Sequence, residues 1–269
     1  MKNAIGIALA MIIIGAILLG AGFMVAGGEL TGFNSKDNHY VEKTYECKDD
    51  IDSIRIEETS GSIIVQTGDV DKAYVTYSDK EDESLYEIEE SDGRLTVKRK
   101  EKKGFHFSFS LIFDFSEHVM TVTVPEDLAG DLDVENTSGS ISLKEIGAKS
   151  VMVENTSGSI TLDHVSSGSD ITVNNTSGTI SFTEVVAQGN VKADNTSGTI
   201  KLDNLSSGED ISLETTSGSI KGTIAGKESD YRITASVVSG SCNLKNTDQG
   251  SKKLNASTTS GSIKIEFAE

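Results

Sequence analysis

The 269-residue chain has no tryptophan, one proline, two cysteines and few aromatic side chains, which make up 6% of the total. Cys47 and Cys242 are too few and too far apart for a disulfide framework or a metal knuckle, although a single disulfide outside the cell stays open as an alternative. Basic residues are also scarce, because 24 Lys and Arg stand against 42 Asp and Glu and give a net charge of −18. Such a surface repels phosphate backbones, so we expect no nucleic-acid partner.

Signatures of the common enzyme classes are missing as well. The histidines, His39, His106, His118 and His164, show no metal-ligand spacing, and the chain contains no nucleophile elbow, phosphate loop or dinucleotide fingerprint. The sequence therefore predicts no catalytic residue, no cofactor and no metal site, and it favours a protein that is not an enzyme.

One long hydrophobic run lies near the N-terminus, where residues 4–26 carry no charge. A helix of that length would span about 34 Å, enough to cross a hydrocarbon core of about 30 Å. A cleaved signal peptide is the alternative, but its apolar region is usually about 7–15 residues long. We therefore predict a single-pass membrane anchor at residues 1–28, followed by a linker at 29–50, with the N-terminus in the cytoplasm beside Lys2 and the remainder outside the cell membrane.

The motif Thr-Ser-Gly-Ser/Thr-Ile recurs about every 20 residues from Gly139 onward, and an isolated copy surrounds Gly61. The residues seven and five before the motif glycine, and two and four after it, are nearly all aliphatic, whereas those between them are mostly polar. Such alternation is typical of half-buried strands. A single repeat cannot bury its aliphatic row, but repeats stacked about 4.8 Å apart can. The sequence thus predicts an all-β fold, a parallel β-solenoid (β-helix) with rungs of about 20 residues.

Two positions of the repeat lead to specific predictions. Cys242 occupies the position two after the glycine, where other rungs have isoleucine, so we expect a buried thiol. Asn136, Asn155, Asn175 and Asn195 stand three before the glycine, where stacked amides would form a hydrogen-bonded ladder. Each also begins an Asn-Thr-Ser sequon, so glycosylation is the alternative. We favour the ladder, because repeated turn chemistry creates one sequon per rung by default.

Carboxylates share a face four residues before the motif glycine, at Glu135, Glu154, Asp194 and Glu214. Stacking would place Glu135 and Glu154 about 4.8 Å apart. A carbohydrate-active β-helix enzyme would need carboxylates on one face at about 5–10 Å, so such an enzyme is an alternative function. The solvated face of an acidic protein produces the same pattern without catalysis, which is the interpretation we favour.

Between Gly61 and Gly139 the period is broken. Residues 73–77, 85–90, 94–98 and 119–124 still have the pattern of strands, and the acidic turns between them suggest irregular first rungs or a side meander. We therefore divide the chain after the linker into an irregular part, 51–130, and a regular solenoid, 131–269.

The irregular part contains a row of alternating phenylalanines. An extended strand would place the members of this row on one face: Phe105, Phe107, Phe109, Phe113 and Phe115. Such a face either packs against the solenoid or forms an exposed edge that contacts a partner. We name these five residues as candidate partner-contact residues.

Taken together, the N-terminal span, the gap between the first two motifs, Pro125 just before the regular rungs and the repeated Thr-Ser-Gly-Ser-Ile resemble a bacterial family. It is the family of β-strand-repeat membrane proteins labelled "putative adhesin" domains of unknown function, which includes proteins of envelope-stress operons. The resemblance covers residues 51–267. It implies a β-solenoid on the outer face of a bacterial membrane, and it supplies no catalytic residue.

We therefore expect a membrane-anchored extracytoplasmic solenoid that acts as a binding or scaffold protein, adhesin-like or accessory to an envelope-stress system. Its expected partners are the cell membrane, through the N-terminal helix, and an envelope protein or cell-surface polysaccharide. A self-assembling structural protein is a further alternative, because an uncapped terminal rung can stack on another copy. The sequence sets no oligomeric state.

Overall fold

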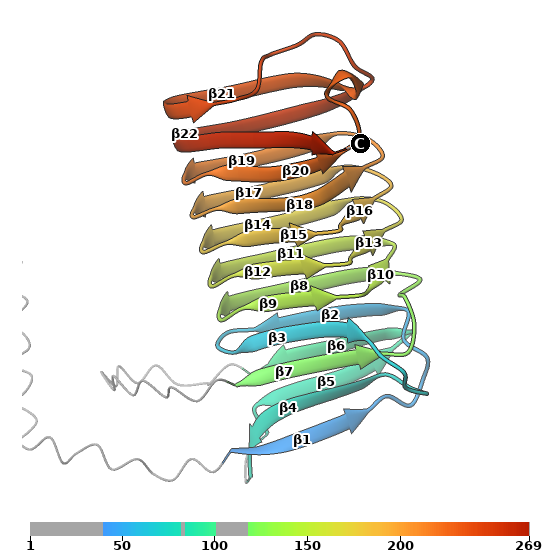
Figure 1. Ribbon diagram of the computed structural model, residues 1–269. Coiled ribbons are helices and arrows are strands. Elements are labelled where there is room, and N and C mark those ends of the chain that lie inside the picture. Colours follow the sequence, from blue (N-terminus) through green and yellow to red (C-terminus); the bar gives the residue numbers. More distant parts are fainter. Residues whose placement is uncertain (1–39, 82–83, 101–117, 269) are drawn as a thin grey trace, which may run out of the picture. The chain divides into compact units, whose positions relative to one another are not determined.

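Parallel strands stacked rung on rung make up most of the computed structural model (Figure 1). The structure describes residues 40–81, 84–100 and 118–268. The predicted anchor at residues 1–28 and the row from Phe105 to Phe115 lie outside the described residues. Inside these ranges, no helix has the length and apolar character needed to span a bilayer.

Each regular rung has two main strands that meet at the Thr-Ser-Gly corner. The strands before the corner are β8 (Asp131–Ser138), β11 (Ser150–Ser157), β14 (Ile171–Ser177), β17 (Val191–Ser197) and β19 (Ile211–Ser217). The strands after it are β9 (Ile141–Lys144), β12 (Ile160–Asp163), β15 (Ile180–Thr183), β18 (Ile200–Ser207) and β20 (Ile220–Ala225). The return to the next rung contains the short strands β10 (Gly147–Ala148), β13 (Ser166–Ser167) and β16 (Val186–Ala187).

The predicted all-β solenoid and the positions of its aliphatic residues are confirmed by the strand register. Val153 pairs in parallel with Val134 on one side and with Val173 on the other. All three side chains are fully buried, as are the isoleucines and leucines two and four residues after the corner in the same rungs. The core is therefore a set of columns of buried side chains along the stack. Burial of one aliphatic side chain contributes about 1.5–3 kcal/mol to stability.

The corner glycines are required by geometry. Gly178 has φ 132°, and a Cβ added there would lie 2.1 Å from the carbonyl oxygen of Gly158 in the neighbouring rung. Only glycine combines this conformation with such close approach of two backbones. Six residues after the corner, four of the five regular rungs have a second left-handed residue, which is not glycine. These residues are Glu145, His164, Glu184 and Asn204, with φ between 49° and 58°.

At the N-terminal end, the first rung in the sequence is not the first in space. The rung formed by β2 (Ser53–Glu58) and β3 (Ser62–Thr67) lies between the regular rung β8–β9 and a rung formed by β6 (Arg94–Arg99) and β7 (Val119–Val124). Antiparallel strands flank this outer rung: β4 (Tyr74–Lys80) pairs with β7, and β5 (Tyr86–Ser91) pairs with β6. The irregular part thus contains both predicted arrangements, an extra rung and a side meander.

A further strand, β1 (Tyr40–Glu46), pairs with β4 in antiparallel orientation. It lies inside the range 29–50 that we described as a linker, so part of that range adds to the sheet. The alternating exposure of its residues did not stand out in the sequence, because this strand buries little of its surface.

The C-terminal end also departs from sequence order. After a short 3-10 helix, η2 (Glu228–Asp230), the chain forms β21 (Tyr231–Cys242) and then β22 (Lys252–Ala268), but β22 lies between β19–β20 and β21. Strand β21 is therefore the last of the stack (Figure 1). Cys242 pairs in register with Ile263, as the repeat predicts, yet its side chain is exposed. Our prediction of a buried thiol at Cys242 is wrong, because no rung in the described part of the chain covers β21.

Candidate functional site

A groove with a volume of about 800 Å³ runs along the stack beside the Thr-Ser-Gly corner. One wall is formed by the residues four before the corner glycine and the other by the residues two before it. The residue between them, three before the glycine, is buried. The first wall, which we call the acidic wall, contains Glu57, Glu135, Glu154, Asp194 and Glu214. The second, the threonine wall, contains Thr137, Thr156, Thr176, Thr196 and Thr216 in the central rungs. The repeat of the sequence thus becomes two parallel rows of outward-facing polar side chains.

The floor of the groove is the column of asparagines, which lie 2–6% exposed. The amide of Asn175 donates a hydrogen bond of 3.0 Å to the carbonyl oxygen of Gly158, one rung away. Asn136, Asn155 and Asn195 make the same bond to the corner glycine of their neighbouring rung, each at 2.9 Å. The predicted ladder of amide-to-amide bonds is therefore corrected. The amides bond to the backbone instead. At each corner, the asparagine side chain reaches the glycine carbonyl oxygen of the neighbouring rung and donates a hydrogen bond to it.

The same geometry bears on the sequons. Each of the four amide nitrogens is engaged in a hydrogen bond, and each side chain is buried. A glycan attached there would have to displace both the hydrogen bond and the neighbouring rung. The folded solenoid therefore does not accommodate glycosylation at these asparagines.

An ion pair continues the column toward the N-terminal end. Glu58 pairs in register with Asn136, and its Oε1 lies 2.9 Å from Nη1 of Arg99 in the next rung outward. The hydroxyl of Tyr86 donates to the other carboxylate oxygen at 2.5 Å. Burial and the Glu58 carboxylate raise the pKa of Tyr86 well above its usual value. Sequence reasoning missed this cluster, although Glu58 stands three residues before Gly61 and so occupies the asparagine position.

Most carboxylates of the acidic wall have neighbours that hold them. Glu135 and Glu154 are adjacent in register, as predicted. Arg55 contacts Glu57 at 2.9 Å and Glu135 at 3.0 Å. Hydrogen bonds from Lys98, and then from Arg55, lower the pKa of Glu57 below its usual value.

Farther along the acidic wall, Asn174 donates to Glu154 at 2.9 Å, and Lys192 lies 2.8 Å from Asp194. A glycosidase needs a carboxylic acid and a second carboxylate that both face a bound sugar. These contacts instead describe carboxylates that bind neighbouring cations and amides. In the described part of the chain, no group of three or more His, Cys, Asp or Glu is placed to hold a metal ion.

The candidate partner-contact residues Phe105, Phe107, Phe109, Phe113 and Phe115 lie outside the described residues. The structure describes the strands on either side of them in the sequence, β6 before and β7 after. Val119 at the start of β7 pairs with Ser62, and Lys98 near the end of β6 pairs with Glu57.

Comparison with known proteins gives no match among curated proteins. Solved structures that are similar include a "putative cell adhesion protein" from Clostridium sporogenes, 12% identical, which covers 86% of this chain and 100% of its own with a TM-score of 0.42. A "putative adhesin" from Bacteroides fragilis is 14% identical. The match covers 86% of this chain and 98% of the adhesin, with a TM-score of 0.48. A "putative lipid binding protein" from Parabacteroides distasonis is 12% identical. The match covers 85% of this chain and 97% of that protein, with a TM-score of 0.42.

Likeness at these identities and TM-scores carries no argument about ligand or activity. The repeat region itself is more informative. Residues 51–269 match the family model described as Toastrack DUF4097, which confirms the family resemblance drawn from the repeated motif, and the chain therefore belongs to the Toastrack DUF4097 family.

Proposed function

We propose that this protein is a membrane-anchored extracytoplasmic scaffold that binds its partner along the solenoid, in an adhesin-like or envelope-stress accessory role. The observation that carries the proposal is the groove, in which the same side chains recur from rung to rung on a backbone held in register. Equal spacing lets a linear partner make many weak contacts at once, so that avidity replaces one strong site. The protein then acts by contact rather than by catalysis.

The partner that best suits this surface is an envelope protein segment or a polysaccharide. Threonine hydroxyls supply donors and acceptors along one wall, and the carboxylates of the other wall attract hydroxyl groups or cations. The hydrophobic run at residues 4–26 supports anchoring in the cell membrane, with the solenoid outside.

The groove is tested by capture of partners from cross-linked native membranes with the tagged full-length protein. Thr176→Lys places a long charged side chain in the threonine wall, and we expect it to abolish capture of the specific partner. Thr161→Lys is the matched control, because Thr161 faces outward on β12, away from the groove. The same partners recovered with both variants and the wild type would contradict binding in the groove.

The membrane topology has its own test, which uses the exposed thiol of Cys242. A membrane-impermeant maleimide applied to intact cells should label this cysteine if the solenoid lies outside the membrane. Labelling that appears only after the cells are lysed would overturn the proposed location. Sequencing the N-terminus of the mature protein distinguishes an anchor from a cleaved signal peptide.

The phenylalanine row stays a predicted contact of the same scaffold. The double variant Phe107→Ser, Phe109→Ser should lose a captured partner while the far-ultraviolet circular dichroism of the protein stays unchanged. Unchanged capture would remove this row as a contact surface.

A second candidate function, self-assembly, is favoured by the open edge of β21. Side chains of the following loop cover the first part of this edge, where Asn246 accepts a hydrogen bond from the backbone N–H of Ala235 at 2.7 Å. The remainder, Ser236–Cys242, pairs with β22 alone among the described strands, carries no charge and includes Val238, which is 78% exposed. Edge strands are usually protected by charged residues, as β5 is by its glutamates. An unprotected edge at one end only favours a closed, two-fold pairing of two copies over open-ended fibres.

Sedimentation of the full-length protein in mild detergent tests this second function. Val238→Lys should shift a concentration-dependent dimer to the monomer. Val186→Lys should not, because Val186 is also exposed, at 40%, but lies on β16, which is paired on both sides. A wild-type protein that stays monomeric at all concentrations would contradict self-assembly and leave the scaffold function intact.

A further inference from the structure

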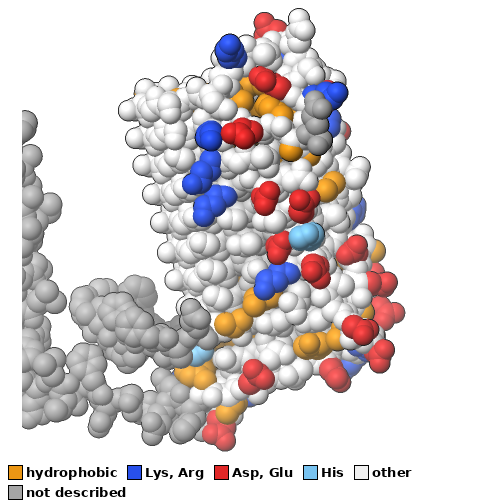
Figure 2. Space-filling view, viewed as in Figure 1, with side chains coloured by type: hydrophobic (Ala, Val, Ile, Leu, Met, Phe, Trp, Pro, Cys, Tyr) orange, Lys and Arg blue, Asp and Glu red, His pale blue; other side chains and the backbone are white. Residues whose placement is uncertain are grey.

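Three lysines are stacked directly on one another on the sheet that follows the corner. Lys201 of β18 pairs in register with Lys221 of β20, and Lys221 pairs with Lys264 of β22. All three side chains are exposed. Strands in a sheet lie about 4.8 Å apart, so these residues form a straight row of positive charge along the stack. Figure 2 shows a row of basic side chains on this face of the molecule.

Such a row is unfavourable for the isolated protein. Like charges directly opposite each other on neighbouring strands are destabilising. Lys264 has a counterion, Glu266, at 3.4 Å, but both side chains are more than 60% exposed, so the pair contributes little. Lys201 and Lys221 have no carboxylate within ion-pair distance among the residues that the structure describes.

The fold does not require lysine at this position. The three preceding regular rungs have uncharged residues three positions after the corner glycine: Ser142, Thr161 and Ser181. Those rungs pair in the same register as the lysine rungs, and the isoleucine that precedes this position is buried in all six rungs. Three adjacent lysines in a chain of net charge −18 therefore do not follow from the stacking of rungs.

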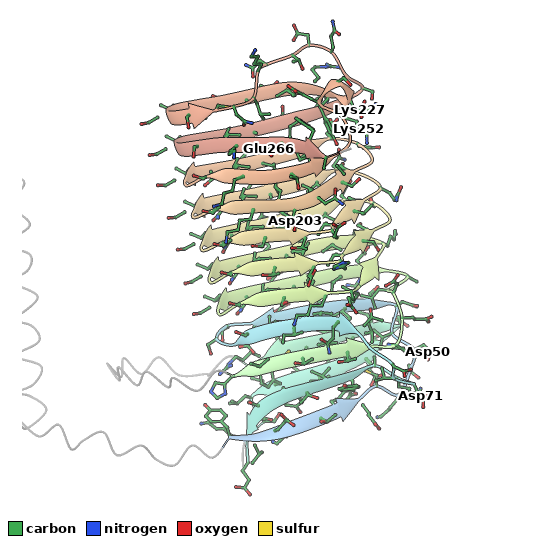
Figure 3. All side chains as sticks on the ribbon, viewed as in Figure 1. Asp50, Asp71, Asp203, Lys227, Lys252 and Glu266 are labelled. Carbon is green, nitrogen blue, oxygen red and sulfur yellow. The ribbon has the colours of Figure 1, made fainter. Side chains whose placement is uncertain are left out.

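The residues on one side of the lysine row can bind an anionic ligand, whereas those on the other side repel it. Hydroxyl groups flank the row one residue after the corner, at Thr199, Ser219 and Ser262. Two carboxylates flank it five residues after the corner, Asp203 and Glu266, which are labelled in Figure 3. An anion bound by the lysines would thus lie toward the hydroxyl row and away from the carboxylates.

We propose that Lys201, Lys221 and Lys264 form a binding site for a linear polyanion that lies along the stack. A single small anion could contact only part of an open row, whereas a polymer whose negative groups repeat at a similar spacing contacts all three ammonium groups. This inference rests on the proposed scaffold function and names the chemical class of one partner. It concerns a different face from the groove, so the two can fail separately.

Direct binding to the purified full-length protein in mild detergent tests the site, with three probes. Polygalacturonate carries carboxylates, long-chain inorganic polyphosphate carries phosphates, and dextran is a neutral polymer. We expect one or both polyanions to bind at low salt and dextran not to bind. Binding of polygalacturonate alone identifies a carboxylate polymer as the ligand, and binding of polyphosphate alone identifies a phosphate polymer. Equal binding of dextran, or no binding of either polyanion, would overturn the proposal.

The triple variant Lys201→Ser, Lys221→Thr, Lys264→Ser uses residue types that earlier rungs already have at this position, so it should fold. We expect it to weaken polyanion binding by about tenfold or more and to flatten the dependence of affinity on salt, because fewer counterions are released. Lys144→Ser is the control, since Lys144 is an exposed lysine elsewhere on the same sheet, and it should change affinity less than about twofold.

Two outcomes of the variant experiment overturn the site: unchanged affinity in the triple variant, or an equal loss in Lys144→Ser. Capture of a partner that is lost with Thr176→Lys but retained in the triple variant would leave the scaffold function standing without this site. Loss of a captured polyanion in the triple variant alone would support both.

Discussion

Glu58 and Arg99 form a buried ion pair between two neighbouring rungs, with Oε1 and Nη1 2.9 Å apart, in the column where the next four rungs have asparagine. The Glu58 side chain is 1% exposed and that of Arg99 is 18% exposed. The pair connects β2 to β6 and so links the regular solenoid to the irregular rung at its N-terminal end.

Removal of one partner should destabilise the protein strongly. Arg99→Gln leaves the Glu58 carboxylate buried without its cation, and we expect a loss of about 3–5 kcal/mol in the free energy of unfolding. Urea unfolding followed by circular dichroism measures the effect. Lys98→Gln is the control, because Lys98 is 48% exposed and its pair with Glu57 should contribute less than about 1 kcal/mol. A loss in Arg99→Gln as small as the control's would show that the pair is unimportant.

The corner glycines should tolerate no side chain. In Gly178→Ala, the new Cβ would lie 2.1 Å from the carbonyl oxygen of Gly158 in a left-handed conformation, and we expect a loss of about 1–3 kcal/mol or more. Gly168→Ala should be nearly neutral, since the nearest atom to its added Cβ is 3.7 Å away. Equal thermal stability of the two variants would contradict the corner geometry.

The second left-handed position should allow stabilisation. Glu145 has φ 49° and an exposed side chain, and asparagine adopts this conformation more readily than glutamate. We expect Glu145→Asn to raise the free energy of unfolding by about 0.5–1 kcal/mol. Glu209→Asn removes the same charge from an exposed residue outside the left-handed region and should have little effect. If both changes raise stability equally, the gain comes from charge rather than from backbone conformation.

The two cysteines should differ in reactivity. Cys47 is 2% exposed, and burial, with a smaller effect of Glu90, raises the pKa of its thiol to about 11. Cys242 is exposed, and both thiols are free. At about pH 8, maleimide should modify Cys242 in the folded protein and reach Cys47 only after unfolding. Modification of Cys47 at the same rate as Cys242 would show that the N-terminal strands open readily.

Acid should weaken the rungs around Glu57. Hydrogen bonds from Lys98 and Arg55 lower its pKa below the ordinary 4.5 in the folded protein. The unfolded chain therefore takes up its proton first as the pH falls. The stabilisation is complete above about pH 4.5 and is lost as the pH falls through the lower folded pKa. Urea unfolding across this range should show a smaller acid-induced loss in Glu57→Gln than in the wild type, and identical slopes would exclude Glu57 as a contributor.

The candidate site was only partly predictable. The spacing of Glu135 and Glu154 from their corner glycines was enough to predict that they are neighbours. The hydrogen-bond acceptor of the Asn175 amide could not be predicted from the sequence, because the orientation of the Gly158 carbonyl depends on how two corners stack. Arg99 was missed because the segment that follows it interrupts the motif, so nothing in the sequence aligns it with Glu58.

The sequence by itself determined the register and the core of this protein. A repeat of about 20 residues with fixed aliphatic positions allows only one alignment of neighbouring rungs, since a shift by one residue would expose the aliphatic row. The tertiary structure alone decided the order of rungs at both ends. Rungs with the same pattern can pair with any neighbour, so the sequence does not tell whether β21 or β22 stacks on β19. That choice is made by the whole stack, and it is the reason that Cys242 lies exposed while Ile263, in the equivalent position of the rung beneath, is buried.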